Sequence, residues 1–480
     1  MHKFDFRRYQ SHIFCIFSIV QKSKRMPLNQ RKFYIETYGC QMNFADSEIV
    51  NSIMIDNGMQ PVHKAEEADI IFLNTCSIRE NAETRVWNRL KEFRGLKRQK
   101  KNDLIVGVLG CMAERVRERF LEKEKLVDIV VGPDAYRDIP NLISEVSDGR
   151  KAVNVLLSQE ETYADIAPVR TTGNGVTAFV SIMRGCDNMC SFCVVPFTRG
   201  RERSRPWQSI QDELKQLSDQ GYRDVTLLGQ NVNSYHDNGV HFADLMYKAS
   251  QVDPEMRIRF STSHPKDFPN DLLHVIAEQP NLCSYIHIPA QSGNSEILER
   301  MRRPYTREEY LELIATMREL IPGVSLSTDI ITGFCGETDE QHAETLSLMQ
   351  TVKYDLAYMF AYSERDRTLA QRKYSDNIPE AVKKQRLAEV ISLQQSVQEV
   401  NNRAEIGTRH LVLAEGSSKR SDDQLFGRTD TNKVVIFDRK NFDVNQYVDV
   451  EITGSTSATL FAEPVKVSSI AEFFGTTVTV

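Results

Sequence analysis

Three closely spaced cysteines constrain this chain more than any other feature. Cys186, Cys190 and Cys193 have the spacing C-x3-C-x2-C, and Gly185 precedes them directly after an apolar segment. Three thiolates can hold three irons of a 4Fe–4S cubane and leave the fourth iron without a protein ligand. An electron-transfer ferredoxin would carry the run C-x2-C-x2-C-x3-C-P, which this sequence lacks. The motif therefore predicts a cluster with one open iron.

An open iron of this kind can be chelated by the amino and carboxylate groups of S-adenosylmethionine. One electron from the cluster then breaks the sulfonium carbon–sulfur bond and gives a 5′-deoxyadenosyl radical, which is chemistry of the cofactor. The alternative is a zinc site, which needs a fourth ligand. The loop after Cys193 has neither a cysteine nor a histidine. We therefore expect Cys186, Cys190 and Cys193 to ligate a catalytic cluster.

Strands and helices alternate in the region before this motif. Short apolar runs rich in β-branched or aromatic residues predict strands at residues 33–38, 69–74, 104–109 and 127–131. Helical stretches lie at residues 45–57, 79–98, 113–122 and 135–146. The second strand lacks strict polar alternation, as expected when both faces are covered. The pattern predicts an N-terminal doubly wound α/β domain with a parallel sheet.

A cysteine follows each of the first three predicted strands. Cys40, Cys76 and Cys111 stand close to the carboxyl ends of these strands, at the edge where open parallel sheets bind ligands. Glycine or polar neighbours at each position favour three converging thiol ligands. The alternative is that each is a small buried hydrophobe, as free cysteines commonly are. The spacing alone leaves both interpretations open.

A second series of strands and helices follows a linker at residues 158–175. The candidate strands recur every 30 to 45 residues or so, at residues 178–183, 224–228, 257–261, 285–288, 324–330 and 356–362. Six parallel strands predict a partial (β/α)6 barrel with active-site residues at the carboxyl ends of the strands. A long polar helix, from about residue 380 to 404, closes this region.

The sequence pattern changes after this helix. Five short strands separated by Gly, Ser, Asp and Asn are expected at residues 410–415, 424–429, 433–437, 447–453 and 459–467. They predict a small antiparallel β-barrel, OB-like in size and strand number. Such barrels often bind nucleic acid, but this one has no net basic excess.

The bulk composition fits a globular protein of several domains. The chain has 480 residues, of which 41% are hydrophobic and 26% charged. Nine cysteines are too few for a disulfide scaffold, and cluster ligation predicts a reducing, cytoplasmic setting. Residues 13–20 are apolar but short, basic residues follow at once, and no cleavage site is apparent. We expect residues 1–30 to be a disordered extension and the chain to have no membrane span.

Basic residues are unevenly spread, although the formal net charge is −6. Residues 79–101 contain nine basic residues against three acidic ones. Two further groups are Arg199, Arg201, Arg203 and Arg205, and Arg300, Arg302 and Arg303. Taken singly, each group is typical of a solvated face. The first two flank presumed cluster loops, and what they do depends on the site beside them.

The cysteine loop also carries a family resemblance. Residues 185–205, GCDNMCSFCVVPFTRGRERSR, resemble the methylthiotransferases of the radical S-adenosylmethionine superfamily. So does the order of a three-cysteine domain, a radical barrel and a small terminal barrel, the TRAM module. The resemblance runs from about residue 31 to 468. Residues 36–48, ETYGCQMNFADSE, resemble the MiaB branch of tRNA 2-methylthio-N6-isopentenyladenosine synthases, because Gln41 and Met42 replace the Pro-Lys of the RimO branch and the Arg-Val of the threonylcarbamoyladenosine branch.

This resemblance implies a second 4Fe–4S cluster on Cys40, Cys76 and Cys111 that donates sulfur. The implied reaction converts N6-isopentenyladenosine at position 37, beside the anticodon, to its 2-methylthio derivative and uses two S-adenosylmethionine molecules. One methylates the cluster-borne sulfur, and the other generates the radical that abstracts hydrogen from C2 of adenine. The implied domains are an extension at residues 1–30, the methylthiotransferase domain at 31–150, the radical core at 172–402 and the TRAM domain at 405–468.

Further polar residues follow or end the later strands and are candidates for contacts with S-adenosylmethionine. They are Gly229, Gln230, Asn231, Ser263, Gln291 and Asp329. The alternative for each is a loop or capping residue. Asp366-Arg367 replaces the family's usual Pro-Gly, which puts that loop and its ligand contacts in doubt. Cys15, Cys283 and Cys335 fit neither cluster and are expected to be structural.

The expected partners are the anticodon stem-loop of an isopentenylated tRNA and an electron donor such as flavodoxin or ferredoxin, with the chain acting as a cytoplasmic monomer. With this partner, the basic groups at residues 79–101 and 199–205 would contact phosphates and position the stem-loop without reading its sequence. The target base must be unstacked to reach the site. Two alternatives remain. One is RimO-like methylthiolation of a ribosomal protein, and the other is a non-catalytic iron–sulfur carrier or RNA-binding protein.

Overall fold

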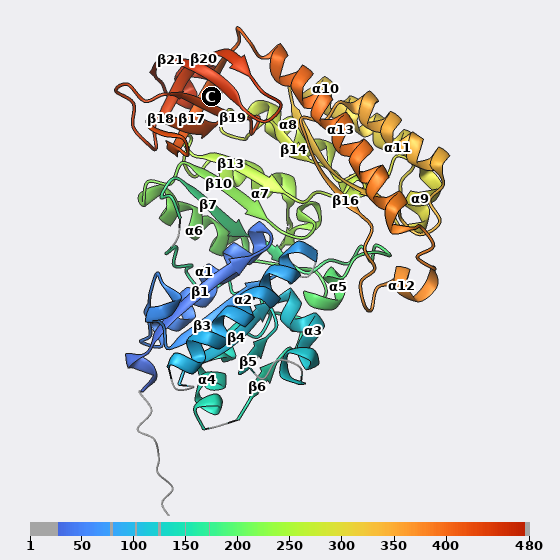
Figure 1. The fold of residues 1–480 in the computed structure, drawn as a ribbon. Coiled ribbons are helices and arrows are strands. Elements are labelled where there is room, and N and C mark those ends of the chain that lie inside the picture. Colours follow the sequence, from blue (N-terminus) through green and yellow to red (C-terminus); the bar gives the residue numbers. More distant parts are fainter. Residues whose placement is uncertain are drawn as a thin grey trace, which may run out of the picture.

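Three units follow one another along the chain (Figure 1). The computed structural model describes residues 27–76, 80–100, 103–122, 126–148, 150–171 and 173–475. Most of the expected N-terminal extension therefore lies outside the described residues, but Leu28–Gln30 form a 3-10 turn. No helix in the described residues has the length and apolar character needed to cross a bilayer.

The N-terminal unit is a six-stranded parallel sheet with the order β2-β1-β3-β4-β5-β6. Its strands are β1 (Lys32–Tyr38), β2 (Gln60–Pro61), β3 (Ile70–Thr75), β4 (Ile105–Gly110), β5 (Ile129–Val131) and β6 (Ala152–Asn154). Its helices are α1 (Gln41–Asp56), α2 (Glu80–Gln99), α3 (Cys111–Glu122) and α4 (Ile139–Ser147). The four predicted strands are present, and the short edge strands β2 and β6 were not expected.

Alternating residues of the central strands explain why this sheet is covered on both faces. In β3, Ile70 and Phe72 pack with residues of α1 and α4, while Ile71 and Leu73 pack with residues of α2 and α3. Successive side chains of a strand point to opposite faces, so a fully apolar strand needs helices on both sides. This confirms the doubly wound α/β prediction.

The middle unit is a half-open barrel of six parallel strands. Its strands are β7 (Thr177–Ser181), β10 (Asp224–Leu228), β13 (Arg257–Ser261), β14 (Tyr285–His287), β15 (Ser325–Thr332) and β16 (Leu356–Ala361). They form the sheets β13-β10-β7 and β14-β15-β16, which meet through a parallel bridge between Ile258 and Leu282. This is the expected partial (β/α)6 barrel. The expected first strand stops at Ser181, because Met183 leaves the sheet to pair elsewhere.

Helices cover the outside of this half barrel. They are α6 (Trp207–Asp219), α7 (Phe242–Ser250), α8 (Asn270–Glu278), α9 (Ser295–Arg300), α10 (Arg307–Leu320), α11 (Asp339–Val352) and the long α13 (Glu380–Ala404). One continuous apolar core joins strands and helices from Ala178 to Val390. Short elements punctuate the loops, namely α5 (Val195–Thr198), α12 (Leu369–Lys373), the ribbon β8 (Met183–Arg184) with β9 (Arg203–Ser204), and the ribbon β11 (His236–Asp237) with β12 (Val240–His241).

The C-terminal unit is a closed five-stranded barrel with the order β17-β18-β19-β21-β20. Its strands are β17 (Arg409–Ser418), β18 (Ser421–Arg428), β19 (Val434–Asp438), β20 (Tyr447–Ser455) and β21 (Leu460–Val467), followed by α14 (Ile470–Phe474). The expected barrel is present, although β19 and β21 pair in parallel. It docks on the half barrel at the end away from the N-terminal unit (Figure 1), where Arg257 donates to the carbonyl oxygens of Arg428 and Leu411 at 2.8 and 2.6 Å.

Candidate functional site

The three cysteines of the N-terminal unit lie at one edge of its sheet. Cys40 precedes α1, Cys76 follows β3, and Cys111 opens α3. Because β1, β3 and β4 are neighbours in a parallel sheet, their carboxyl ends bring the three loops together. Gly39 has a φ of +132°, and a Cβ there would lie 2.3 Å from the Cβ of Cys76. Only glycine lets the first cysteine loop rest against the second.

The thiols of this edge interact with one another and with an arginine from the middle unit. A hydrogen bond with Cys76 lowers the pKa of the Cys40 thiol to about 6, and Arg199 acts in the same direction against the effect of burial. Burial raises the pKa of Cys111, although Arg199 Nε donates to its Sγ at 3.2 Å. The thiolate is the form that binds metals, and Arg199 favours it at both Cys40 and Cys111.

The second cysteine set lies on a loop whose base is a short ribbon. Strands β8 and β9 pair antiparallel, with Arg184 opposite Arg203, and the loop between them carries Cys186, Cys190 and Cys193. Gly185 has a φ of +80°, and a Cβ there would lie 1.9 Å from the carbonyl oxygen of Arg201. A side chain at this position would force the loop open at its base.

Hydrogen bonds reach two of these thiol sulfurs. The backbone N–H of Val195 donates to Cys193 Sγ at 3.4 Å, and Arg303 Nη1 donates to Cys190 Sγ at 3.7 Å. Burial raises the pKa of the Cys186 thiol to about 12. Donors to sulfur of this kind tune iron–sulfur clusters.

A single ion and a cubane cluster place different demands on the ligands. Within the described ranges, no three His, Cys, Asp or Glu side chains gather closely enough to hold a single metal ion. In a cubane, each thiolate binds a different iron. Two cubane clusters held in this way need two sets of three cysteines, which this chain supplies.

Buried polar atoms without partners line the carboxyl ends of the adjacent strands. Asn231 Oδ1, Ser263 Oγ and Gln291 Oε1 are buried and have no hydrogen-bond partner in the described part of the chain. These residues follow β10, β13 and β14 in turn. Orphaned buried atoms also occur elsewhere in the chain, but each costs about 1–3 kcal/mol, so three after successive strands fit a polar ligand such as S-adenosylmethionine.

The other three predicted contacts have different surroundings. Gly229 packs against Met183, since a Cβ would lie 2.5 Å from its Cγ. Gln230 Oε1 accepts the backbone N–H of Gly185 at 2.6 Å and so supports the cysteine loop. Asp329 is partly exposed, and its Oδ1 lies 3.7 Å from His287 Nε2. Gly229 and Gln230 therefore help to shape the base of the cysteine loop.

A buried charge network joins the two cysteine sets. Asp46 on α1 lies 2.9 Å from Arg184 and 2.7 Å from Arg199, and all three side chains are at most 3% exposed. Asp134 pairs with Arg203 at 2.9 Å. Arg184 and Arg199 lower the pKa of Asp46 although burial opposes them. The loop that carries the second cysteine set is thus tied by ion pairs to the unit that carries the first.

The arrangement corrects one expectation from the sequence. Arg199, Arg203 and Arg205 are buried at 3–6% exposure, so they are not available to RNA phosphates, and only Arg201 of that group is exposed. Arg303 is buried as well. Alternating arginines on a loop look the same in sequence whether solvent or a second domain faces them. The exposed basic residues of α2 are Arg85, Lys91, Arg94 and Arg98; Arg79 and Lys101 lie outside the described residues.

The residues that depart from the family pattern, and the cysteines outside the two sets, can be placed in the structure. Asp366 Oδ2 lies 3.6 Å from Arg115 Nη1 on α3, the helix that Cys111 opens, so this loop contacts the N-terminal unit. Ala370, just beyond it, donates its backbone N–H to the carbonyl oxygen of Ser191 at 2.7 Å. Cys283 and Cys335 are buried, and Cys335 belongs to an apolar cluster against which Phe192 of the second cysteine loop packs. Cys15 lies outside the described residues.

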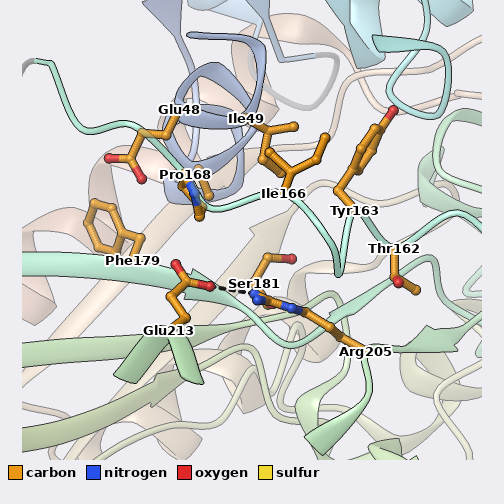
Figure 2. A pocket seen from close by; sticks show the side chains of 11 residues that line it. Glu48, Ile49, Thr162, Tyr163, Ile166, Pro168, Phe179, Ser181, Arg205 and Glu213 are labelled. Atoms are coloured by element: carbon orange, nitrogen blue, oxygen red, sulfur yellow. Dashed lines mark hydrogen bonds and ion pairs between the residues drawn. The ribbon is translucent and has the colours of Figure 1, made fainter. Parts of the chain in front are cut away.

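A small pocket lies between the N-terminal unit and the half barrel (Figure 2). Its volume is about 10 Å³, which is room for about one water molecule and far too little for a nucleoside. Arg205 pairs with Glu213 on one side of it, and Glu48 of α1 lies on the other. Burial raises the pKa of Glu48 to about 7. The pocket belongs to the packing between two units and not to the cysteine sites.

Comparisons with known proteins agree with this architecture. Residues 32–132 match the family described as uncharacterized protein family UPF0004, residues 180–349 match the radical SAM superfamily, and residues 403–465 match the TRAM domain. A radical S-adenosylmethionine methyltransferase, TsrM of Kitasatospora setae, solved with cobalamin and a 4Fe-4S cluster, has a TM-score of 0.52 at 16% identity and covers 71% of this chain and 77% of its own. That likeness concerns the fold alone.

Curated relatives are far more similar. The tRNA-2-methylthio-N(6)-dimethylallyladenosine synthase of Chloroherpeton thalassium is 58% identical over 435 residues, which cover 90% of this chain and 96% of that protein. The corresponding synthase of Christiangramia forsetii is 52% identical over 458 residues, covering 92% and 95%. The mitochondrial tRNA methylthiotransferase of Homo sapiens is 49% identical over 486 residues, covering 90% and 81%. The chain therefore belongs to the radical S-adenosylmethionine methylthiotransferases, in the family of the tRNA-2-methylthio-N(6)-dimethylallyladenosine synthases.

Proposed function

We propose that this chain is a tRNA methylthiotransferase that converts N6-isopentenyladenosine at position 37 to its 2-methylthio derivative. The observation that carries the proposal is the pair of three-cysteine sets, on two different units, tied together by Arg199 and Asp46. A radical site alone can activate a carbon–hydrogen bond. Inserting sulfur needs a sulfur source held close by, which the second set can hold.

The site residues divide into three groups. We propose that Cys186, Cys190 and Cys193 ligate the radical cluster, and that Cys40, Cys76 and Cys111 ligate the auxiliary cluster. S-adenosylmethionine would be contacted by six residues that follow or end the barrel strands, of which the first two would also shape the loop beside it: Gly229, Gln230, Asn231, Ser263, Gln291 and Asp329. When bound, the two clusters and S-adenosylmethionine supply the radical, the sulfur and the methyl group.

The remaining residues bind and orient. Gly185 and Gln230 fix the base of the radical loop, and Arg303 holds Cys190 against Pro289, whose carbonyl oxygen it meets at 2.6 Å. The unactivated C2–H of adenine has no acidic proton for a side-chain base to remove. We therefore assign no general base, and propose that these residues act by holding cofactor and cysteines in a fixed geometry.

The substrate and partners follow from the same proposal. The anticodon stem-loop would contact the exposed basic side chains of α2 through its phosphates. The C-terminal barrel, which matches the TRAM domain, would hold the rest of the tRNA. Residues 31–150, 172–402 and 405–468 are proposed as the methylthiotransferase, radical and TRAM domains, with residues 1–30 as an extension. One-electron reduction calls for a donor such as flavodoxin or ferredoxin, and we propose a cytoplasmic monomer.

The decisive experiment offers two substrates to the anaerobically reconstituted protein. With dithionite and S-adenosylmethionine present, isopentenylated tRNA and ribosomal protein are each incubated and analysed by mass spectrometry. We expect the methylthio mass increment on the tRNA nucleoside only. An increment on protein alone would overturn the proposal in favour of a RimO-like enzyme, and no 5′-deoxyadenosine at all would favour a non-catalytic iron–sulfur protein.

Iron analysis tests the two cysteine sets separately. Two cubane clusters predict about eight irons per chain. Cys76→Ala should reduce this to about four while 5′-deoxyadenosine still forms, because the radical cluster is intact. Cys283→Ala is the matched control, since Cys283 is equally buried but lies in neither set. About four irons in the unsubstituted protein would contradict the auxiliary site.

A further inference from the structure

One arginine crosses between the two cysteine sets. Arg199 follows α5 on the loop of the radical cysteines, six residues after Cys193. Its side chain is buried and donates from Nε to Cys111 Sγ at 3.2 Å and from Nη2 to Asp46 Oδ2 at 2.7 Å. Its third nitrogen, Nη1, is buried and has no hydrogen-bond partner among the described residues. A guanidinium keeps its charge in any environment, so the unpartnered N–H group requires an acceptor.

The charges around Arg199 do not balance. Arg184, Arg199 and Arg203 are buried with Asp46 and Asp134, so three cations meet two carboxylates. The remaining positive charge would be costly in such a buried place without an anionic partner. Arg199 is the member that touches a cysteine. Arg184 also has two buried nitrogens, Nε and Nη1, without a hydrogen-bond partner among the described residues. Of the two arginines, Arg199 is the one at the Cys40, Cys76 and Cys111 edge, where three thiolates would bring negative charge.

We propose that Arg199 is a positioning residue for the auxiliary cluster, supplied across the domain contact by the radical loop. This assignment rests on the proposed function, because Arg199 needs an anionic partner and the proposed function requires the cluster that would supply it. Nε holds the thiolate of Cys111, and Nη1 donates to a sulfur of the cluster. A cation and two N–H donors stabilise the more negative, reduced state and raise the reduction potential of the cluster.

The radical site has its own arginine in a comparable position. Arg303 donates to Cys190 Sγ and is also buried, but its other nitrogens are occupied by Tyr305 and Pro289. Arg199 alone of the two retains a free buried N–H group. Each cysteine set thus has one guanidinium, and only the auxiliary one comes from the other domain.

The test measures the potential of the auxiliary cluster alone. In the full chain, Cys186, Cys190 and Cys193 are replaced by Ala so that the remaining cluster gives the only iron–sulfur signal in an EPR-monitored redox titration. Arg199→Gln, Arg199→Lys and Arg203→Gln are compared in this background, with iron counted in each. Arg203 is the matched control, because it is buried in the same network and pairs with Asp134 without touching a thiol.

We expect Arg199→Gln to lower the equilibrium constant for reduction of the auxiliary cluster about tenfold, which makes its reduction potential about 59 mV more negative for a one-electron couple. Arg199→Lys should recover part of that shift, and Arg203→Gln should leave the potential unchanged. An unchanged potential in Arg199→Gln with full iron, or an equal shift in Arg203→Gln, would overturn the proposal. If Arg199→Gln does not retain iron, the reduction potential of the Arg199→Lys variant decides, and an unshifted potential in that variant would overturn the proposal. Absence of an auxiliary cluster in the unsubstituted chain would instead refute the proposed function.

Discussion

Replacing Asp46 by Asn is the sharpest test of the buried network. Asp46 is fully buried and serves two guanidinium groups, Arg184 at 2.9 Å and Arg199 at 2.7 Å. The amide keeps the shape of the carboxylate but removes its charge, so both arginines lose their shared counter-ion. Removing one partner of a buried ion pair costs about 3–5 kcal/mol, because the remaining charge stays uncompensated. We expect a loss of that size in Asp46→Asn.

The two tryptophans make the measurement specific to one domain. Trp87 stacks on Phe120 in the N-terminal unit, and Trp207 begins α6 of the half barrel. In a Trp207→Phe background, fluorescence in a urea titration follows the N-terminal unit alone. Because a chain of several domains need not unfold in one step, the free energy is taken from the Trp87 transition.

A surface pair in the same part of the molecule is the matched control. Asp165 pairs with Arg137, but its side chain is 72% exposed, and surface ion pairs contribute about 0–1 kcal/mol. Asp165→Asn should therefore lower the free energy of unfolding by less than about 1 kcal/mol. The reasoning would be refuted if Asp46→Asn cost no more than this control.

Three further predictions follow. Burial raises the pKa of Glu48 to about 7, so between its ordinary pKa and 7 the folded state keeps a proton that the unfolded state has lost, and stability falls as pH rises. In denaturant unfolding, Glu48→Gln should therefore be more stable than the native chain by up to about 3 kcal/mol at pH 8 and by little at pH 5. A difference in stability that does not depend on pH would contradict the shift. The Asp366–Arg115 contact, at 3.6 Å with Asp366 64% exposed, should give a coupling energy of about 0.5 kcal/mol in a double-mutant cycle of Asp366→Ala and Arg115→Ala, and zero coupling would show that the loop does not hold α3. Reversing the charge of exposed α2 residues should weaken tRNA binding and flatten its dependence on salt by about one counter-ion per residue, as a filter-binding salt titration would report; an unchanged salt slope would place the RNA elsewhere. The α2 residues concerned are Arg85, Lys91, Arg94 and Arg98.

Local pattern predicted most of the fold because each signal is short-range. The apolar run at residues 69–74 has no polar alternation, and the structure buries that strand between two helical layers. The turn residues after residue 405 mark the five barrel strands closely. The two-residue strand β2 and the three-residue β6 escaped prediction because runs so short carry no period, and they exist only because a neighbouring strand offers its edge.

The candidate site was predicted unevenly. The spacing of Cys186, Cys190 and Cys193 is a local motif and needs no fold to be recognised. Cys40, Cys76 and Cys111 are separated by 35 and 34 intervening residues and acquire meaning only as ends of neighbouring parallel strands. For Gln230, the sequence predicts a ligand contact, and the structure adds that its Oε1 accepts the backbone N–H of Gly185; a side-chain amide near a loop can serve both purposes.

The sequence by itself determined the order of the three units, most of the strands that build them and the six thiols. Only the tertiary structure decided what the arginines do. Arg199 and Arg201 are two residues apart on one loop, yet one is buried against Cys111 and Asp46 and the other is exposed. The physical reason is that the groups packed around a charged side chain decide whether it is buried in an ion pair or solvated. For Arg199 the partner is Asp46, which lies 153 residues away in sequence, on a different domain.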